Sequence, residues 1–318
     1  MLRNSSATRT TAHALSAGPW WGLLGVLSFS LTVPFTRVAV GGLSPLFIGA
    51  GRAVVAALPA AVALAVTRQR PPTRRQWVRL AVVAAGIVAG FPLLTSFALT
   101  TVPASHGAVV IALLPVATAA VAVLRTRERL PRSFWVTAAV GAVAALAFAS
   151  LQSGGFGGLH VADVLLFGAV VAAAVGYAEG GLLARELGSW QTVSWALVLA
   201  APVMLAGTAA SVVSAPPSAT PQEWAAFAYL AAVSMYLGFF AWYRGLAIGP
   251  IAQVSQVQLV QPVLTIAWAA LLLGEELTWA TVLGGLAVVV CAAVAVRIRL
   301  DRGGGARRQR RRAPSRAA

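Results

Sequence analysis

Apolar runs of about 20 residues, separated by short polar connectors, follow one another along almost the whole chain. A helix of that length crosses the hydrocarbon core of a bilayer, and a soluble domain would not combine 59% hydrophobic with only 10% charged residues. The pattern predicts an all-α integral membrane protein with ten transmembrane helices. They are expected at about residues 19–38, 44–66, 78–98, 103–124, 133–151, 161–182, 190–212, 223–244, 250–272 and 278–297.

The second half of the chain repeats the first at an offset of 147 residues. Residue pairs that share this offset are Pro103 and Pro250, Pro115 and Pro262, and Glu128 and Glu275. Residues 125–132 hold four arginines, whereas the equivalent residues 272–279 hold none. Because arginine gathers at cytoplasmic helix ends, equivalent ends of the two copies should lie on opposite sides of the membrane. This predicts two inverted five-helix repeats, as in many secondary transporters.

Arginine also orients the whole chain. With the N-terminus in the cytoplasm, all of the 24 basic residues except Arg37 and Arg52 fall on the cytoplasmic side. We therefore expect a multi-pass protein of the cell (inner) membrane with both termini cytoplasmic. The expected segments are a cytoplasmic N-terminal tail (1–18), a first repeat (19–151), an external linker (152–160), a second repeat (161–297) and a disordered, arginine-rich cytoplasmic tail (298–318).

Several kinds of chemistry lack the residues that they need. All 24 basic residues are arginine, so a phosphate-binding loop of the Walker type has no lysine. A single cysteine, Cys291, and three dispersed histidines show no metal-ligand spacing. We therefore expect no cofactor, no metal and no enzyme activity. Helix ends and the C-terminal tail account for the net charge of +16, which favours contact with membrane lipids over nucleic acid.

Two helix-to-helix junctions, related by the repeat, and two shorter motifs form a recognisable set. They are Pro115…Glu128-Arg-Leu130, Pro262…Gly274-Glu275-Glu-Leu277, Trp21-Gly22 and Gly51-Arg52. Together they resemble the EamA-type transporters, ten-helix members of the drug/metabolite transporter superfamily with two EamA repeats, over about residues 19–297. The resemblance implies transport of small organic molecules, usually export and often of amino acids or related metabolites. It also implies a central cavity lined by the third, fourth, eighth and ninth helices.

The densest polar cluster inside a predicted span lies in the ninth helix. Gln253, Gln256 and Gln261 are accompanied there by Ser255 and Gln258. Gln253 and Gln261 share one side of a helix, and Gln256 flanks that side. A wall of amides suits hydrogen bonding to a substrate, although amide pairs between helices would use the same residues. We predict Gln253, Gln256 and Gln261 as substrate-binding residues.

His106 occupies the position in the first repeat that is equivalent to Gln253. Polar residues at equivalent positions suggest opposing elements of one pathway, and an imidazole changes its charge near neutral pH. His106 is therefore predicted to bind substrate or to carry a proton. The alternative is a histidine near the outer interface that is hydrated by water.

Charged residues inside membrane spans are rare and mark either pathways or buried pairs. Glu179 lies near the cytoplasmic end of the sixth span and is predicted to couple protons, with a solvated entrance residue or a partner of Arg244 as the alternative. Arg52 lies within the second span and could attract an anionic group of a substrate. For Arg52 the sequence favours pairing with an acid or snorkelling to the interface.

Aromatic residues near span ends supply further cavity candidates. Tyr236 and Tyr243 lie in the last part of the eighth span, and Phe91 lies in the third. Such rings can stack on a substrate or anchor a helix at the interface. We predict Tyr236 and Tyr243 as cavity residues.

Four further residues are predicted to be structural. Pro115 and Pro262 lie within spans, where a proline frees a backbone carbonyl and can kink the helix. Glu128 and Glu275 lie at helix junctions, where a carboxylate stabilises the positive end of a helix.

The whole pattern predicts a secondary transporter that moves a small-molecule substrate by alternating access between inverted halves. A passive channel would also use a polar ninth span and is the first alternative. A membrane-embedded enzyme or a lipid-handling protein is weaker, because the spans contain no catalytic constellation with paired carboxylates. A homodimer is compatible with the sequence.

Overall fold

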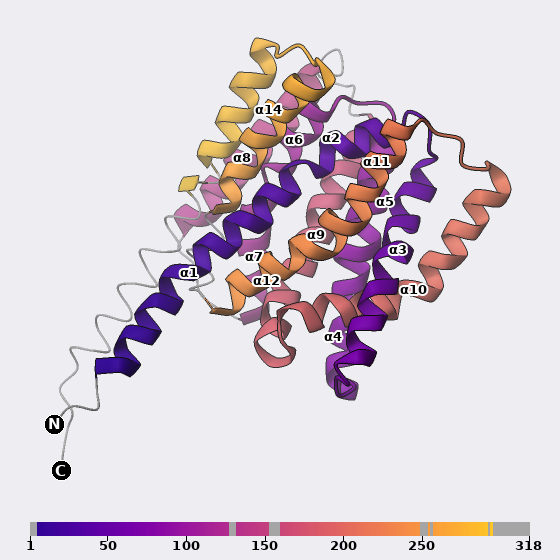
Figure 1. Cartoon of the computed structure of the whole chain (residues 1–318). Coiled ribbons are helices and arrows are strands. Elements are labelled where there is room, and N and C mark those ends of the chain that lie inside the picture. The colour runs from indigo at the N-terminus through magenta and orange to yellow at the C-terminus, as the bar shows by residue number, and fades with distance from the viewer. Residues whose placement is uncertain are drawn as a thin grey trace.

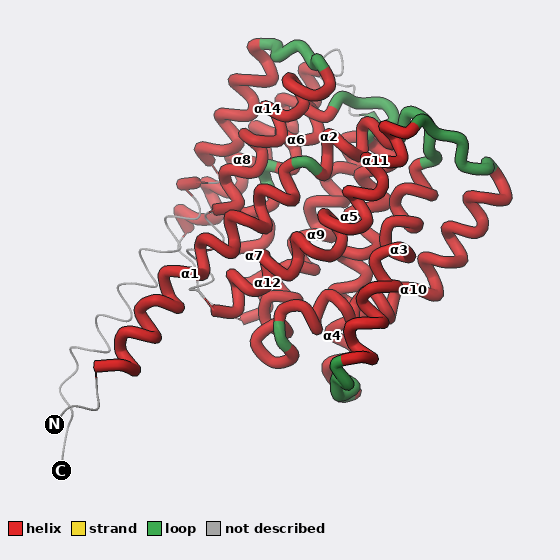
Figure 2. Tube along the Cα trace, in the orientation of Figure 1, coloured by secondary structure: helices red, strands yellow, loops and turns green. Residues whose placement is uncertain are grey.

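The computed structural model describes residues 5–126, 132–152, 160–248, 254, 257–291 and 293–294. Throughout these residues every regular element is a helix (Figure 1, Figure 2). The first half contains α1 (Ser5–Ser30), α2 (Thr32–Ala39), α3 (Pro45–Val66), α4 (Arg74–Val83), η1 (Ala84–Gly90), α5 (Phe91–Ala98), α6 (Ala104–Ile111), α7 (Leu114–Thr126) and α8 (Arg132–Gln152). The second half contains α9 (Val161–Leu187), α10 (Ser189–Ser214), α11 (Pro221–Tyr229), η2 (Leu230–Leu237), α12 (Gly238–Ile248), η3 (Gln258–Val260) and α14 (Gln261–Leu273).

Seven helical stretches among the described residues are long and apolar enough to cross a membrane. They are Ala17–Ala39, Pro45–Val66, Arg74–Ala98, Ala104–Arg125, Val161–Leu187, Ser189–Ser214 and Pro221–Ile248. Three shorter apolar helices, Arg132–Ala145, Gln258–Leu273 and Trp279–Cys291, lie where the fifth, ninth and tenth spans are predicted. The chain is therefore an all-α, multi-pass membrane protein.

Several sequence predictions fall on residues outside the described ranges. These residues are Glu128, Gln253, Gln256, most of the linker (153–159) and the C-terminal tail (298–318). At the other end of the chain, α1 begins at Ser5. The helix that enters the first span therefore already includes most of the predicted N-terminal tail.

The loops gather at two opposite ends of the helix bundle (Figure 2). One end carries the connectors at 40–44, 99–103, 215–220 and 274–278. The other end carries the connector at 67–73 and the α9–α10 turn at Gly188, and we call it the α4 end. Arg68 and Arg70 belong to the α4 end, and α4 itself begins with Arg74 and Arg75.

Two of the predicted spans are interrupted just before a proline. A two-residue turn separates α6 from α7, whose second residue is Pro115. The short 3-10 helix η3 precedes α14, whose second residue is Pro262. A proline lacks the N–H donor, and its ring crowds the carbonyl four residues earlier, so it kinks or breaks an α-helix. The helices α1, α3 and α10 nevertheless continue through Pro19, Pro59 and Pro202. The breaks lie where the sequence predicts kinks.

Local structure follows the 147-residue offset as well. Thr73 and Gln76 form a capping box at the start of α4, in which the Thr73 N–H donates to Gln76 Oε1 at 2.9 Å. Thr220 and Glu223 form the equivalent box at the start of α11, with the Thr220 N–H donating to Glu223 Oε2 at 2.7 Å. Each box satisfies N–H groups that a helix leaves free at its N-terminus. The π-helical segments η1 and η2 follow these two helices and also lie about one repeat apart.

Helix α9 lies in the middle of the bundle (Figure 1). It packs against α4, η1, α5, α6 and α7 of the first half and against α10 and α12 of the second. Gly176 of α9 lies close to Gly86 of η1. A Cβ atom at Gly86 would collide with the carbonyl oxygen of Ala172, and one at Gly176 would collide with the side chain of Ile87. The two halves therefore interlock through backbones that touch, as small residues permit in membrane helices.

Candidate functional site

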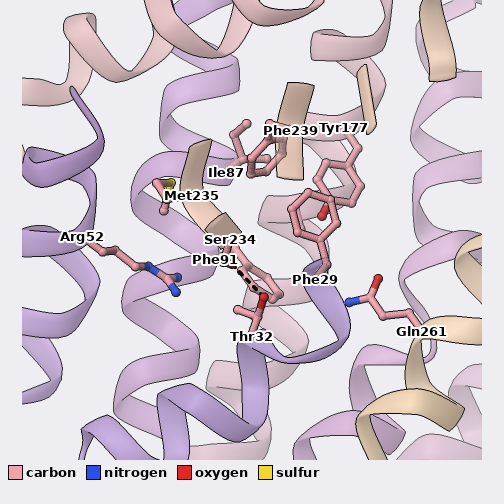
Figure 3. Close-up of a pocket in the computed structure, with 11 residues that line it drawn as sticks. Phe29, Thr32, Arg52, Ile87, Phe91, Tyr177, Ser234, Met235, Phe239 and Gln261 are labelled. Carbon is pink, nitrogen blue, oxygen red and sulfur yellow. Dashed lines mark hydrogen bonds between the residues drawn. The ribbon is translucent and has the colours of Figure 1, made fainter. Parts of the chain in front are cut away.

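A cavity with an empty volume of about 390 Å³, which includes space open to solvent, lies between the two halves (Figure 3). Its lining residues are Phe29, Thr32, Arg52, Ile87, Phe91, Ala173, Tyr177, Ser234, Met235, Phe239 and Gln261. They come from α1, α2, α3, η1 and α5 of the first half and from α9, η2, α12 and α14 of the second. Because both halves build the wall, a movement of one half against the other would reshape the cavity. We call it the central cavity.

Arg52 extends from α3 into one side of the central cavity (Figure 3). Its residue exposure is 1%, and neither Nε nor Nη1 has a hydrogen-bond partner. Among the described residues, no carboxylate forms an ion pair with its guanidinium. The guanidinium is therefore neither paired with an acid nor exposed at the interface, which are the two roles that the sequence favours. A buried charge without a partner is unfavourable, and such residues in membrane spans often mark a ligand site.

Polar groups of α2, η2 and α14 complete the wall of the cavity. Gln261 points toward the cavity from the side opposite Arg52 (Figure 3), and its Oε1 atom has no hydrogen-bond partner. Between them the hydroxyls of Thr32 and Ser234 form a buried hydrogen bond of 2.7 Å. Gln261 is thus the predicted ninth-span amide that the structure places in the cavity.

An aromatic cluster forms the remaining side of the cavity. The ring of Phe29 lies 4.9 Å from that of Phe239 and 6.3 Å from that of Tyr177, measured between centroids. Tyr177 also packs against Trp242 at 5.7 Å. Such ring contacts give a rigid apolar surface that can hold a flat or aliphatic group. Phe91, one of the third-span aromatics noted in the sequence, lines the cavity as well.

The two π-helical segments both border the central cavity. Ile87 of η1 and Ser234 and Met235 of η2 are lining residues. A π-turn adds a residue to a helical turn and so rotates all following side chains relative to a regular α-helix. Tyr236, which lies in η2 directly after Met235, does not line the cavity. Its hydroxyl instead bonds Ser194 of α10 at 3.1 Å.

Tyr243 likewise lies between helices. It is fully buried, and its hydroxyl donates to the Gly176 carbonyl of α9 at 3.4 Å. Its ring packs closely over Gly180 of the same helix. The two predicted cavity tyrosines therefore contact α9 and α10, and neither lines the central cavity.

A second, smaller cavity with an empty volume of about 260 Å³ adjoins the central one through Gln261. Pro115 and Pro262 both line it, together with residues of α6 and α7. Gln258 lines it too, and neither polar atom of its amide has a hydrogen-bond partner. The proline breaks of the two halves thus face one space. The third, eighth and ninth spans contribute to the central cavity, as the resemblance implies. The fourth span, which the resemblance also implies there, lines the second cavity instead.

Glu179 lies at the α4 end within a cluster of ion pairs. It accepts hydrogen bonds from Nε of Arg79 on α4 and from Nε of Arg125 on α7, the latter at 2.9 Å. Nη1 of Arg79 also contacts Glu186 at 2.5 Å. These four residues, the ionic cluster, connect two helices of the first half to α9 of the second. The partners of Glu179 are thus Arg79 and Arg125 rather than Arg244.

His106 is buried near the opposite end of α9. Its Nε2 lies 2.7 Å from Oδ1 of Asp163, and its ring packs against Phe148 at 5.3 Å. Oδ2 of the same aspartate accepts the His160 N–H at 3.0 Å and so caps α9. His106 is not a lining residue of the central cavity. The structure therefore pairs it with an acid instead of leaving it to water.

Glu275 joins the halves at the end opposite α4. Its carboxylate accepts the N–H groups of Ala104 and Ser105, at 2.7 and 2.9 Å. These are the first residues of α6, so Glu275 caps a helix of the other half rather than the helix that follows it in the chain. A carboxylate at this position meets both free N–H donors and the positive end of the helix dipole.

Sequence reasoning missed most of the central cavity. Thr32, Tyr177 and Ser234 are polar residues inside predicted spans, and that position is the signal that could have found them. Phe29 and Phe239 carry no such signal, because an apolar ring in a membrane span is ordinary. Their role depends on which face of each helix turns inward.

The sequence model of the EamA-like transporter family matches the chain twice, over residues 16–150 and 160–297. The chain therefore belongs to the EamA-like transporter family and consists largely of two EamA repeats.

Individual proteins agree with this assignment. The uncharacterized transporter YdeK of Bacillus subtilis (strain 168) is 43% identical over 286 residues, which cover 87% of this chain and 96% of YdeK. A crystal structure that is 20% identical in sequence aligns with a TM-score of 0.62 over 88% of this chain and 96% of that one. This second likeness concerns the fold. Family and relative together make the chain a membrane transporter.

Proposed function

We propose that the protein is a secondary transporter that exports small organic metabolites, such as amino acids or related compounds, by alternating access. The single observation that carries this proposal is the central cavity. Residues of both halves line it, and a buried, unpaired arginine points into it. A site between two halves becomes open to one side of the membrane or the other as the halves rock.

The proposed architecture is ten membrane helices in two inverted repeats of five. The capping boxes, the π-helical segments and the proline breaks that recur about 147 residues apart support it. The arginines of the α4 end support its placement in the cytoplasm, with both chain termini on that side of the cell membrane.

Closure at the α4 end involves the ionic cluster and the aromatic cluster. The ion pairs of Glu179 join α4 and α7 to α9, and the rings of Phe29, Tyr177 and Phe239 lie at the central cavity. In the proposed cycle these contacts hold the α4 end shut. They separate when the cavity opens toward the cytoplasm to load substrate.

Proton coupling can use either of two buried acids with basic partners. Glu179 would take up a proton only in a state in which its pairs with Arg79 and Arg125 are broken. His106 would exchange a proton within its pair with Asp163. Glu179→Gln or His106→Gln should then abolish transport driven by a pH gradient while leaving substrate exchange intact. Loss of exchange as well would assign the residue to structure instead.

Counterflow in proteoliposomes tests the proposed function. Vesicles holding the full chain are preloaded with a mixture of unlabelled amino acids and other metabolites, and uptake of single labelled compounds is followed. We expect saturable uptake that depends on the preload. Gln261→Ala should reduce it several-fold, while Gln69→Ala, in the α3–α4 connector, should not.

Two outcomes would contradict the proposal. Flux that rises linearly with concentration and needs no preload would identify a passive channel. Saturable uptake of no compound in the mixture would exclude these metabolites as substrates.

A further inference from the structure

We infer that the central cavity binds an organic anion whose acidic group pairs with Arg52 and whose apolar body lies against the aromatic cluster. The inference rests on the proposed function and narrows it: within the class of amino acids and related compounds, it assigns the same cavity to acids that lack the ammonium group. Figure 3 shows the arrangement, with Arg52 on one side and Phe29, Tyr177 and Phe239 on another. A small molecule with an acidic end and an apolar end would span the two.

The first argument is the charge of the wall. Arg52 is 1% exposed, and none of the residues that line the central cavity is acidic. By contrast, Arg79 and Arg125 at the α4 end share the carboxylate of Glu179. Arg52 is therefore a buried cation for which the described protein supplies no counter-ion. Its planar N–H donors match the two oxygens of a carboxylate or of a similar acidic group.

The second argument concerns an ammonium group, which an amino acid would bring together with its carboxylate. In the central cavity an ammonium would find hydroxyls, one amide and the faces of aromatic rings, which attract cations, but no carboxylate to neutralise its charge. Two of these hydroxyls, on Thr32 and Ser234, already bond each other at 2.7 Å. The positive Arg52 would also repel a second cation in a medium of low dielectric constant. The wall therefore discriminates against zwitterions and cations, because its lining supplies no counter-ion for an ammonium and because Arg52 repels it.

The third argument concerns the remainder of the ligand. The aromatic cluster offers it an apolar surface, since the rings of Phe29 and Phe239 lie 4.9 Å apart. On the side opposite Arg52, the unpartnered Oε1 of Gln261 can accept one hydrogen bond from a hydroxyl or N–H of the ligand. The structure thus assigns a monoanionic organic acid with an aromatic or aliphatic body.

Three probes of matched shape test this assignment: 3-phenylpropionate, phenylalanine and 3-phenylpropylamine, which are an anion, a zwitterion and a cation. Binding to the full chain in detergent micelles is measured by calorimetry. We expect 3-phenylpropionate to bind at least tenfold more tightly than the other two. Arg52→Gln should weaken its binding at least tenfold, and Arg52→Lys should keep the preference for the anion. Arg185→Gln, at the α4 end and outside the cavity, is the matched control and should bind as the wild type does.

Thermal unfolding without any probe separates a binding role of Arg52 from a structural one. If Arg52 serves to bind a ligand and does not stabilise the fold, the Arg52→Gln variant should unfold at an unchanged or higher temperature. A large fall in that temperature would assign Arg52 to structure and overturn the inference. Tighter binding of phenylalanine or the amine to the wild type would overturn it too, as would equal anion binding by wild type and Arg52→Gln, or binding of none of the three probes.

Counterflow with the same probes distinguishes this inference from the proposed function. Saturable exchange of amino acids that is insensitive to Arg52→Gln would support the proposed transport function and would contradict the anion site at Arg52. Arg52-dependent binding of 3-phenylpropionate without any exchange would support the anion site and contradict the carrier.

Discussion

Single buried charges are arranged in two opposite ways in this molecule. Glu179, whose side chain is 8% exposed, lies between two guanidinium groups and links the halves at the α4 end. Arg52 is even more deeply buried and has no such partner. Removing one member of a buried pair leaves the other charge unpaired, whereas removing a charge that has no partner relieves a cost. Substitutions at the two residues should therefore have opposite effects on stability.

Glu179→Gln should destabilise the protein because it leaves Arg79 and Arg125 without their shared carboxylate. We expect a loss of about 3 kcal/mol, the lower end of the range for a broken buried pair, since Arg125 is half-exposed. Glu186→Gln is the control, because it also contacts Arg79 but its side chain is 45% exposed. Its cost should stay below about 1 kcal/mol. Thermal unfolding in detergent measures both, and equal losses would contradict the different burial of the two acids.

Glu275→Ala should destabilise the contact between α14 and α6. The substitution removes the acceptor of two N–H groups at the start of α6, which should cost about 1–2 kcal/mol, as for other lost N-terminal caps. The neighbouring Glu276→Ala removes the same charge from an exposed position and should change stability by no more than about 0.5 kcal/mol. If both variants unfold at the wild-type temperature, the cap does not stabilise the protein.

At the scale of helices, the sequence predicted the interruptions of the chain better than the faces that each helix presents. Proline acts on its own turn, so kinks near Pro115 and Pro262 could be expected from the sequence, although α1, α3 and α10 continue through a proline. Which side chains face the cavity depends on rotation about the helix axis, and a π-turn changes that rotation. No pattern of proline or glycine residues in the sequence indicates the π-helical segment η2. The directions of Tyr236 and Tyr243, which lie within and after it, could therefore not be read from α-helical spacing.

Close contact between α9 and η1 gives a prediction at the same scale. Gly176→Ala should lower stability by about 1–3 kcal/mol, because its Cβ would collide with Ile87 and overpack the contact. Gly168→Ala lies in the same helix, and its Cβ would meet only the end of the Leu94 side chain at 3.3 Å. Both changes bring the same gain in helix propensity. The difference between their unfolding temperatures therefore isolates the collision, and equal temperatures would contradict the tight α9–η1 contact.

At the scale of the whole molecule, the composition and the repeat were enough to predict a helical membrane protein with two related halves. The membrane as solvent requires long apolar helices, and the repeat can be read directly as a fixed spacing of residues in the sequence. The central cavity could not be predicted in this way. It forms where nine helical segments meet, and its single charge is meaningful only because no acid among the described residues pairs with it. The sequence therefore favoured a paired Arg52, and only the packing of α3 among its neighbours shows it unpaired.

Alternating access predicts that weakening the ionic cluster opens the cavity toward the α4 end. Ser234→Cys in a Cys291→Ser background places one thiol in the central cavity, and a membrane-impermeant thiol reagent reports its exposure in vesicles of known orientation. Glu179→Gln should speed labelling from the α4 side about tenfold for each 1.4 kcal/mol by which the closed state is weakened. The opposite side should then label more slowly, because both states share one population.

Glu186→Gln in the same background is the matched control, since it removes an acid of the ionic cluster whose side chain is largely solvated. It should alter labelling from the α4 side less than twofold, because an exposed pair contributes little free energy. Labelling that rises equally from both sides with Glu179→Gln would indicate local unfolding rather than a shift between two states. Labelling that does not change would place the closure of the α4 end elsewhere, with the aromatic rings of Phe29, Tyr177 and Phe239 as the next contacts to remove.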